Sequence, residues 1–195
     1  VSWNDLSRAP SFDSGRTDYE RAAAFKYDIL NLAYERFKEI PDLECRYDNF
    51  AREQAWWLGD YALFVCLKEQ FGGVSWSEWP RELRDRDEAA LKHWSGILAD
   101  RIKREKFYQF LFFRQWSALK IYCNRKQIQI IGDIPIYVSY DSADVWSNPH
   151  LFKLDAEKKP ISVSGVPPDY FSKTGQLWGN PVYSWDRLRK SSFDW

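Results

Sequence analysis

The chain has 195 residues, of which 45% are hydrophobic and 29% are charged, a balance typical of a folded globular protein rather than a disordered one. Its 28 basic side chains equal its 28 acidic ones. Because nucleic-acid-binding domains usually carry excess positive charge, this neutrality argues against nucleic acid as the main partner.

Neither a membrane span nor a disulfide framework is expected. The sequence has no run of about 18 apolar residues, the length that a transmembrane helix requires. Its three cysteines, Cys45, Cys66 and Cys123, lie far apart and form no CxxC pair. This spacing predicts free thiols and no metal site. We therefore expect a cytoplasmic protein, or a plastid one if the source is a plant.

Aromatic residues are unusually frequent, with 11 Trp, 11 Tyr and 13 Phe. Two interpretations of this excess stay open at the level of composition. The rings can form a tryptophan-rich core, or they can line a surface that stacks on flat ligands such as sugar rings or bases.

The first part of the chain, about residues 15–126, is predicted to be helical. A capping box runs from Thr17 to Glu20, where each side chain can bond to the other's backbone N–H. Apolar residues then recur every four positions, at Phe25, Ile29, Ala33 and Phe37. Pro41 is expected to end this helix.

Three more helices are predicted downstream. The first spans residues 50–71 and is closed by Gly72 and Gly73, a typical C-terminal signal. The others span residues 87–98 and 100–124, separated by a very short connection. A final helical stretch, WDRLRK, lies near the end of the sequence.

The helical spacing of apolar residues ends before IQIIGDIPIYV, residues 128–138. This run is β-branched and almost wholly apolar, which predicts a strand buried on both faces, as in a parallel sheet covered by helices. A buried strand after a long helix indicates an α/β fold, either a barrel or a doubly wound sheet. Asp133 lies within this strand, where a carboxylate either faces a site or is satisfied by backbone amides or an arginine.

Residues 140–185 show little regular structure apart from one short predicted strand at 161–166. The segment GVPPDYFSKTGQLWGNPVY, residues 165–183, contains three glycines, three prolines and four large aromatics, and shows neither helix nor strand periodicity. Trp178, flanked by the amides Gln176 and Asn180, suits a sugar, although its ring can also tuck under its own loop. Asp169 is typical of a turn.

Five stretches resemble one known enzyme family. In chain order they are WWLGDYALF (56–64), GGVSWSEWP (72–80), GDIPIYV (132–138), DSADVW (141–146) and GVPPDYFSKTGQLWGNPVY (165–183). They resemble the amylomaltases, or 4-alpha-glucanotransferases, of glycoside hydrolase family 77. The PPDYF and GQLWGNP pieces are far more specific than any short pattern.

The resemblance implies a (β/α)8 TIM barrel with helical and loop insertions, of which this chain holds a central part. About residues 15–126 would be a helical region, 127–139 a barrel strand, and 140–185 a loop insertion at the substrate cleft. The implied activity transfers α-1,4-glucan segments between maltooligosaccharides with retention of configuration, and needs no cofactor or metal. The alternatives are a non-catalytic α-glucan-binding domain and a structural protein whose rings are all buried.

The resemblance also implies a set of substrate-binding residues, namely Asp133, Tyr137, Asp169, Tyr170, Phe171, Gln176, Trp178 and Asn180. Asp133 would line the donor sugar subsite at the end of its barrel strand. Tyr170 and Phe171 would lie on a loop that covers the acceptor side of the cleft. Gln176 and Trp178 would contact sugars near the point of cleavage.

The catalytic carboxylates of the family are not expected in this chain. A retaining mechanism needs a nucleophile and an acid/base about 5–5.5 Å apart. In the family these groups lie in Arg-Ile-Asp-His-type and Glu-Asp-Leu-Gly-type segments, and neither occurs here. We therefore expect a fragment that is inactive alone and needs the remainder of the same enzyme to complete the barrel.

Overall fold

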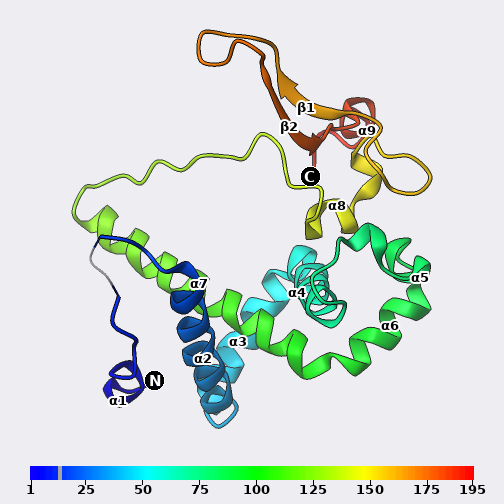
Figure 1. Ribbon diagram of the computed structural model, residues 1–195. Coiled ribbons are helices and arrows are strands. Elements are labelled where there is room, and N and C mark those ends of the chain that lie inside the picture. Colours follow the sequence, from blue (N-terminus) through cyan, green and yellow to red (C-terminus); the bar gives the residue numbers. More distant parts are fainter. Residues whose placement is uncertain (13–14) are drawn as a thin grey trace. The chain divides into compact units, whose positions relative to one another are not determined.

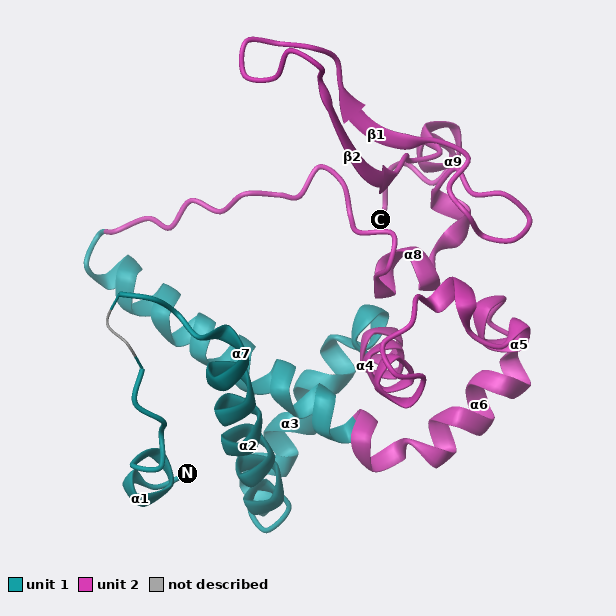
Figure 2. Cartoon of the chain, viewed as in Figure 1, with its two compact units in different colours: residues 1–58, 103–127 teal, residues 59–102, 128–195 magenta. Residues whose placement is uncertain are grey.

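The computed structural model describes residues 1–12 and 15–195, and these form two compact units (Figure 2). Unit 1 comprises residues 1–58 and 103–127, and unit 2 comprises residues 59–102 and 128–195. Two helices, α4 (Ala55–Gln70) and α7 (Ala99–Arg125), which are labelled in Figure 1, belong partly to one unit and partly to the other, as their change of colour in Figure 2 shows.

In the part of unit 1 that is described, all the regular secondary structure is helical. Unit 1 holds α1 (Trp3–Leu6), α2 (Tyr19–Phe37), α3 (Pro41–Glu53), the first turn of α4 and most of α7. Its core is a cluster of stacked and tilted rings, made of Tyr34, Phe37, Tyr47, Phe107, Tyr108 and Phe110. Burying one such ring stabilises the unit by about 1.5–3 kcal/mol.

The helices between residues 17 and 71 begin and end at other positions than predicted, and no separate helix was predicted where α3 lies. Asp18, not Thr17, caps α2, and its carboxylate accepts a hydrogen bond from the backbone N of Arg21 at 3.0 Å. Pro41 does not end a helix but begins α3, a position where its missing N–H costs nothing. A break at Gln54 divides the predicted helix 50–71 between α3 and α4.

Unit 2 has more varied structure. After α4 come the short helices η1 (Trp76–Glu78) and α5 (Arg81–Arg84), then α6 (Glu88–Ile97) and the first turn of α7. The later part holds α8 (Ala143–Ser147), η2 (Pro149–Leu151), β1 (Val163–Val166), β2 (Gln176–Pro181) and α9 (Trp185–Lys190). The predicted helices 87–98, 100–124 and WDRLRK are confirmed as α6, α7 and α9.

The core of unit 2 joins residues that are distant in the sequence. Its fully buried tryptophans are Trp76 and Trp146, and the indole Nε1 of Trp146 donates to the carbonyl oxygen of Leu83 at 3.0 Å. The remaining buried members are Leu63, Phe64, Cys66, Leu67, Trp79, Leu83, Leu98, Val145, Leu151, Phe152, Tyr183 and Leu188. Many of the aromatic residues therefore do form a core, as one of the two interpretations expected.

The predicted barrel strand at 127–139 is not a strand in this structure. Residues 128–136 are neither helical nor paired, and Ile131 and Ile134 are 93% and 83% exposed. A strand exists only where a neighbour accepts its ladder of hydrogen bonds, and within the described residues the sole sheet is the pair β1–β2. The expectation of a strand buried on both faces is thus wrong for this chain taken by itself.

Candidate functional site

Strands β1 and β2 form an antiparallel hairpin that carries most of the predicted site residues (Figure 1). The loop between them, residues 167–175, ends at Gly175, whose φ of +74° lies in the left-handed region. A Cβ atom at this position would lie 2.5 Å from the carbonyl oxygen of Val166. Glycine is therefore required where the loop returns to β2.

The register of the hairpin changes near its base. Val163 pairs with Pro181 whereas Gly165 pairs with Leu177, so two steps along β1 match four along β2. Gly179 lies in this bulged stretch with φ at +80°, a conformation that glycine adopts without strain. The bulge explains why period-two alternation was invisible in the sequence, and why β2 was missed.

Two aromatic rings at the tip of the hairpin are almost fully exposed to solvent. Tyr170 is 97% exposed and Phe171 is 89% exposed, and their rings meet edge to face with centroids 5.6 Å apart. Asp169 shapes this tip, because its Oδ1 atom accepts from the backbone N of Phe171 at 2.9 Å and of Ser172 at 2.8 Å. Exposed apolar rings held by a defined turn are typical of a binding surface.

Trp178 lies on β2 between the exposed tip and the core of unit 2. Its indole Nε1 donates to Oε1 of Gln176 at 3.0 Å, which fixes the ring relative to its own strand. The ring also meets Tyr137 edge to face, with centroids 6.3 Å apart, and it stays 47% exposed. The alternative of a ring tucked under its own loop is therefore wrong.

Asn180 and Tyr137 join the hairpin to the segment that precedes it. The Nδ2 atom of Asn180 donates to the carbonyl oxygen of Val138 at 3.0 Å. The ring of Tyr137 stacks on Tyr183, with centroids 6.1 Å apart and planes 14° from parallel. Burial raises the pKa of Tyr183, so its phenol is harder to ionise than that of a solvent-exposed tyrosine.

The structure does not bring Asp133 into this group. Its side chain is exposed, and its Oδ1 atom accepts from the backbone N of Ile134 at 2.8 Å. Among the described residues, no hydrogen bond joins Asp133 to the hairpin. The expectation of a carboxylate within a buried strand is wrong here, because the segment around Asp133 has no strand beside it.

One exposed apolar residue of the hairpin was not among the predicted substrate-binding residues. Leu177, on β2 between Gln176 and Trp178, is 81% exposed. Its neighbours were selected for their amide and indole groups, whereas a lone leucine carries no chemical signal. Its place within an aromatic, glycine-punctuated run was the only hint available.

Tyr137, Tyr170, Phe171, Gln176, Trp178 and Asn180 are together called the aromatic hairpin surface below, whereas Leu177 points to the other face of β2. This surface offers apolar ring faces together with amide donors and acceptors, a combination that suits the C–H faces and hydroxyl groups of sugars. Within residues 1–12 and 15–195, no helix is long and apolar enough to cross a membrane, and no three acidic, histidine or cysteine side chains gather as metal ligands would.

Comparison with known proteins extends the match to nearly the whole chain. A family model described as 4-alpha-glucanotransferase, glycoside hydrolase family 77, matches residues 3–195. The 4-alpha-glucanotransferase of Synechocystis sp. is 46% identical over 193 residues, and that of Thermus thermophilus is 49% identical over 186. These alignments cover 97% and 94% of this chain but 38% and 37% of the relatives.

A solved structure gives the same result. Amylomaltase from Streptococcus agalactiae in complex with acarbose matches with a TM-score of 0.94 and 40% sequence identity, covering 100% of this chain and 40% of that one. The chain thus spans about two fifths of the length of the proteins it matches. On the match to residues 3–195, the chain belongs to the 4-alpha-glucanotransferase family, glycoside hydrolase family 77.

Proposed function

We propose that the complete protein transfers segments of α-1,4-glucan between maltooligosaccharides with retention of configuration, and that this chain supplies part of its glucan-binding surface. The observation that carries the proposal is the aromatic hairpin surface, where Tyr170, Phe171 and Trp178 expose their rings and the Gln176 amide lies beside Trp178. Family membership supports the reaction type. That a related amylomaltase binds acarbose supports a sugar as the ligand.

Each residue of the surface has a proposed role. Trp178 covers the apolar face of a glucose unit while Gln176 and Asn180 bond its hydroxyls. Tyr170 and Phe171 close over the chain from the hairpin tip. The remaining predicted contacts, Tyr137, Asp133 and Asp169, stay part of the proposal: Tyr137 supports Trp178, and the two carboxylates accept from sugar hydroxyls.

We further propose that the complete protein is a (β/α)8 barrel in which residues 127–139 form a strand. The exposed isoleucines Ile131, Ile134 and Ile136 support this, because they would be covered by neighbouring strands and helices. The nucleophile and the acid/base would come from other parts of the protein, so residues 1–195 alone would not catalyse turnover of a glucan substrate.

The first experiment measures binding by the complete polypeptide that carries these residues. Trp178→Ala is expected to weaken maltoheptaose binding roughly 10- to 100-fold, the equivalent of losing one buried aromatic contact. Trp56→Ala is the matched control, because Trp56 is also exposed but lies outside the hairpin, and it should leave binding unchanged. Equal affinity in the Trp178→Ala variant and the parent would contradict the proposed surface.

The second experiment measures turnover of maltotriose. The complete polypeptide is expected to give longer and shorter maltooligosaccharides, and residues 1–195 alone to give none. Binding without turnover in the complete polypeptide would instead indicate a non-catalytic glucan-binding protein. The relatives described above are all transferases, which favours the enzyme.

A further inference from the structure

Lys68 lies in the last turn of α4 and joins three parts of unit 2 through its ammonium group. Its Nζ atom donates to the carbonyl oxygens of Gly73 at 2.8 Å and Val74 at 2.9 Å, and to Oδ2 of Asp141 at 2.5 Å. A lysine ammonium has three N–H donors, so these three acceptors use all of them. The Lys68 side chain is 21% exposed, which makes the ion pair less screened than one on an open surface.

Asp141 extends the connection into the core. Its second oxygen, Oδ1, accepts from the backbone N of Trp76 at 3.3 Å. Trp76 is fully buried, and its indole Nε1 donates to the carbonyl oxygen of Tyr140 at 2.8 Å while the two rings lie 5.3 Å apart. Residues 140 and 141 are therefore fixed against the end of α4 and against η1.

The opposite end of the same short stretch holds the hairpin. Val138 accepts the hydrogen bond from Asn180, and Tyr137 contacts Trp178. Residues 137–141 thus form a bridge of five residues, with the hairpin at one end and the Lys68–Asp141 pair at the other. Only four peptide units separate Asp141 from Tyr137, and the carbonyl groups of Val138 and Tyr140 between them are held by hydrogen bonds, so we expect a displacement of Asp141 to reach Tyr137.

We propose that Lys68 and Asp141 are a positioning pair for the aromatic hairpin surface, fixing the bridge and thereby the orientation of Tyr137 against Trp178. The pair acts through Tyr137 and has no role in bond breaking. Its effect on glucan binding rests on the proposed function, whereas its effect on the surroundings of Trp178 does not. Both effects are measurable separately.

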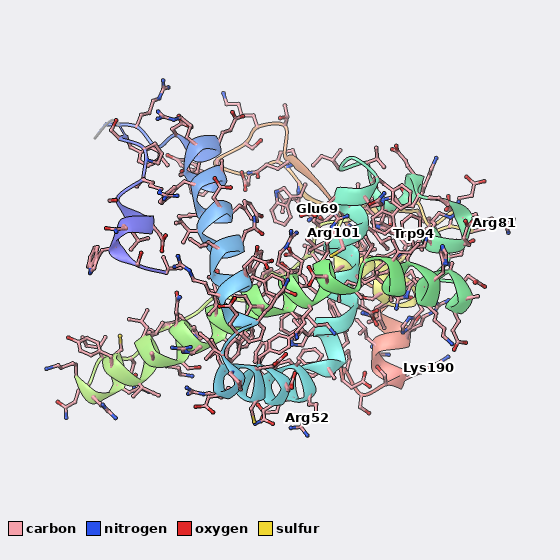
Figure 3. The ribbon with its side chains drawn as sticks, turned by 90° about the horizontal axis from the view of Figure 1, so that it is seen from below. Arg52, Glu69, Arg81, Trp94, Arg101 and Lys190 are labelled. Atoms are coloured by element: carbon pink, nitrogen blue, oxygen red, sulfur yellow. The ribbon has the colours of Figure 1, made fainter. Side chains whose placement is uncertain are left out.

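A suitable control is the ion pair made to Glu69, the residue that follows Lys68 on α4. Arg101, at the start of α7, donates to Glu69 at 2.6 Å and to Gln70 at 3.1 Å (Figure 3). Arg101→Gln therefore removes a positive charge on α7 and its ion pair with the last turn of α4, while leaving the bond between Lys68 and Asp141 in place. A general loss of helix stability would affect this variant as well.

The test uses the complete polypeptide labelled with 5-fluorotryptophan, in which Trp178→Phe assigns the fluorine resonance of Trp178. Asp141→Asn and Lys68→Gln are expected to shift or broaden that resonance and to weaken maltoheptaose binding roughly 3- to 10-fold. Arg101→Gln is expected to do neither. Lys68→Arg keeps the charge but replaces the ammonium by a planar group, so it should shift the resonance less than Lys68→Gln.

Two results would overturn the positioning pair. One is a Trp178 resonance that stays at its parental position in Asp141→Asn, Lys68→Gln and Lys68→Arg. The other is a shifted resonance with unchanged glucan binding. If the parent protein itself binds no maltoheptaose, the proposed function fails, while the fluorine comparison still decides whether the pair orients Trp178.

Discussion

Gly175 is the residue whose missing side chain matters most to the hairpin. Its positive φ and its close approach to Val166 act together, because a Cβ atom would meet the carbonyl oxygen at 2.5 Å and the backbone conformation would be strained as well. Gly96, within α6, is a contrasting case: nothing lies within 4 Å of a Cβ atom built there.

Gly175→Ala is expected to lower the free energy of unfolding by at least about 1–2 kcal/mol, from strain at φ +74° alone. Gly96→Ala should raise it by about 0.5–1 kcal/mol, because alanine loses less backbone entropy in a helix. Denaturant unfolding followed by circular dichroism measures both. If both substitutions changed the free energy of unfolding in the same direction, the steric argument would be contradicted.

Asp169 can serve the turn, the ligand, or both, and two substitutions separate these roles. Asn keeps the Oδ1 acceptor for the amides of Phe171 and Ser172 but removes the charge, whereas Ala removes both. If the turn is the main role, Asp169→Asn should bind maltoheptaose within about twofold of the parent, and Asp169→Ala should weaken binding roughly 5-fold or more. Equal losses in the two variants would instead indicate a direct contact between the carboxylate and a sugar.

At the scale of elements, α3 and α7 are joined in unit 1 by a buried tyrosine. Tyr47 donates from its hydroxyl to the carbonyl oxygen of Lys103 at 3.4 Å, and the Lys103 ammonium bonds to Glu44. Burial, with a smaller contribution from the negative charges of Asp48 and Glu44, raises the pKa of Tyr47 to about 12. The neutral phenol is thus favoured in the folded state.

This raised pKa predicts a loss of stability in alkali. Below pH 10 the phenol is protonated in both states and its contribution is complete; as pH rises from 10.0 to about 12, the unfolded chain loses the proton first, and unfolding becomes easier. Tyr47→Phe, which has no proton to lose, should show a shallower decline of unfolding free energy in this window. Parallel curves for the two proteins would show that Tyr47 is not the responsible group.

The elements that could be predicted from the sequence are those specified by local signals. The bounds of α6 and α7 were predicted to within about a residue, and α6 has a local start signal in Asp87, which caps it. The break at Gln54 carries no glycine or proline and was missed. β2 was missed because strand structure depends on its partner β1 and on a bulge at Gly179, neither of which leaves a periodic pattern.

Some features of the candidate site could likewise be predicted from the sequence, and others could not. Tyr170, Phe171 and Trp178 are exposed, as rings on a substrate-binding loop would be, whereas Tyr183 of the same non-periodic run belongs to the core of unit 2. The place of Asp133 could not be predicted, because it depends on pairing between segments that are distant in the sequence. The support of Tyr137 by Tyr183 was likewise invisible, because long-range packing leaves no local signal.

At the scale of the whole molecule, residues 128–136 form an exposed segment that lies outside every helix and strand of the described residues. It exposes a run of β-branched side chains together with unpaired backbone groups, the features that make free strands associate. The relatives that this chain matches are more than twice its length. The proposed barrel would supply the missing neighbours and convert the same residues from exposed to buried.

Ile131→Lys is therefore expected to have opposite effects in the two contexts. In residues 1–195 alone it should increase the soluble fraction, because Ile131 is 93% exposed and a charge there interrupts an exposed apolar run. In the complete polypeptide it should lower the free energy of unfolding by several kcal/mol, on the order of an unpaired buried charge.

Ile97→Lys, on the exposed end of α6, is the control, and it should change neither the soluble fraction nor the free energy of unfolding strongly. Sedimentation of the isolated chain and denaturant unfolding of the complete polypeptide measure the two effects. An improvement in both contexts would mean that Ile131 stays exposed in the complete protein, and that residues 127–139 are not a barrel strand.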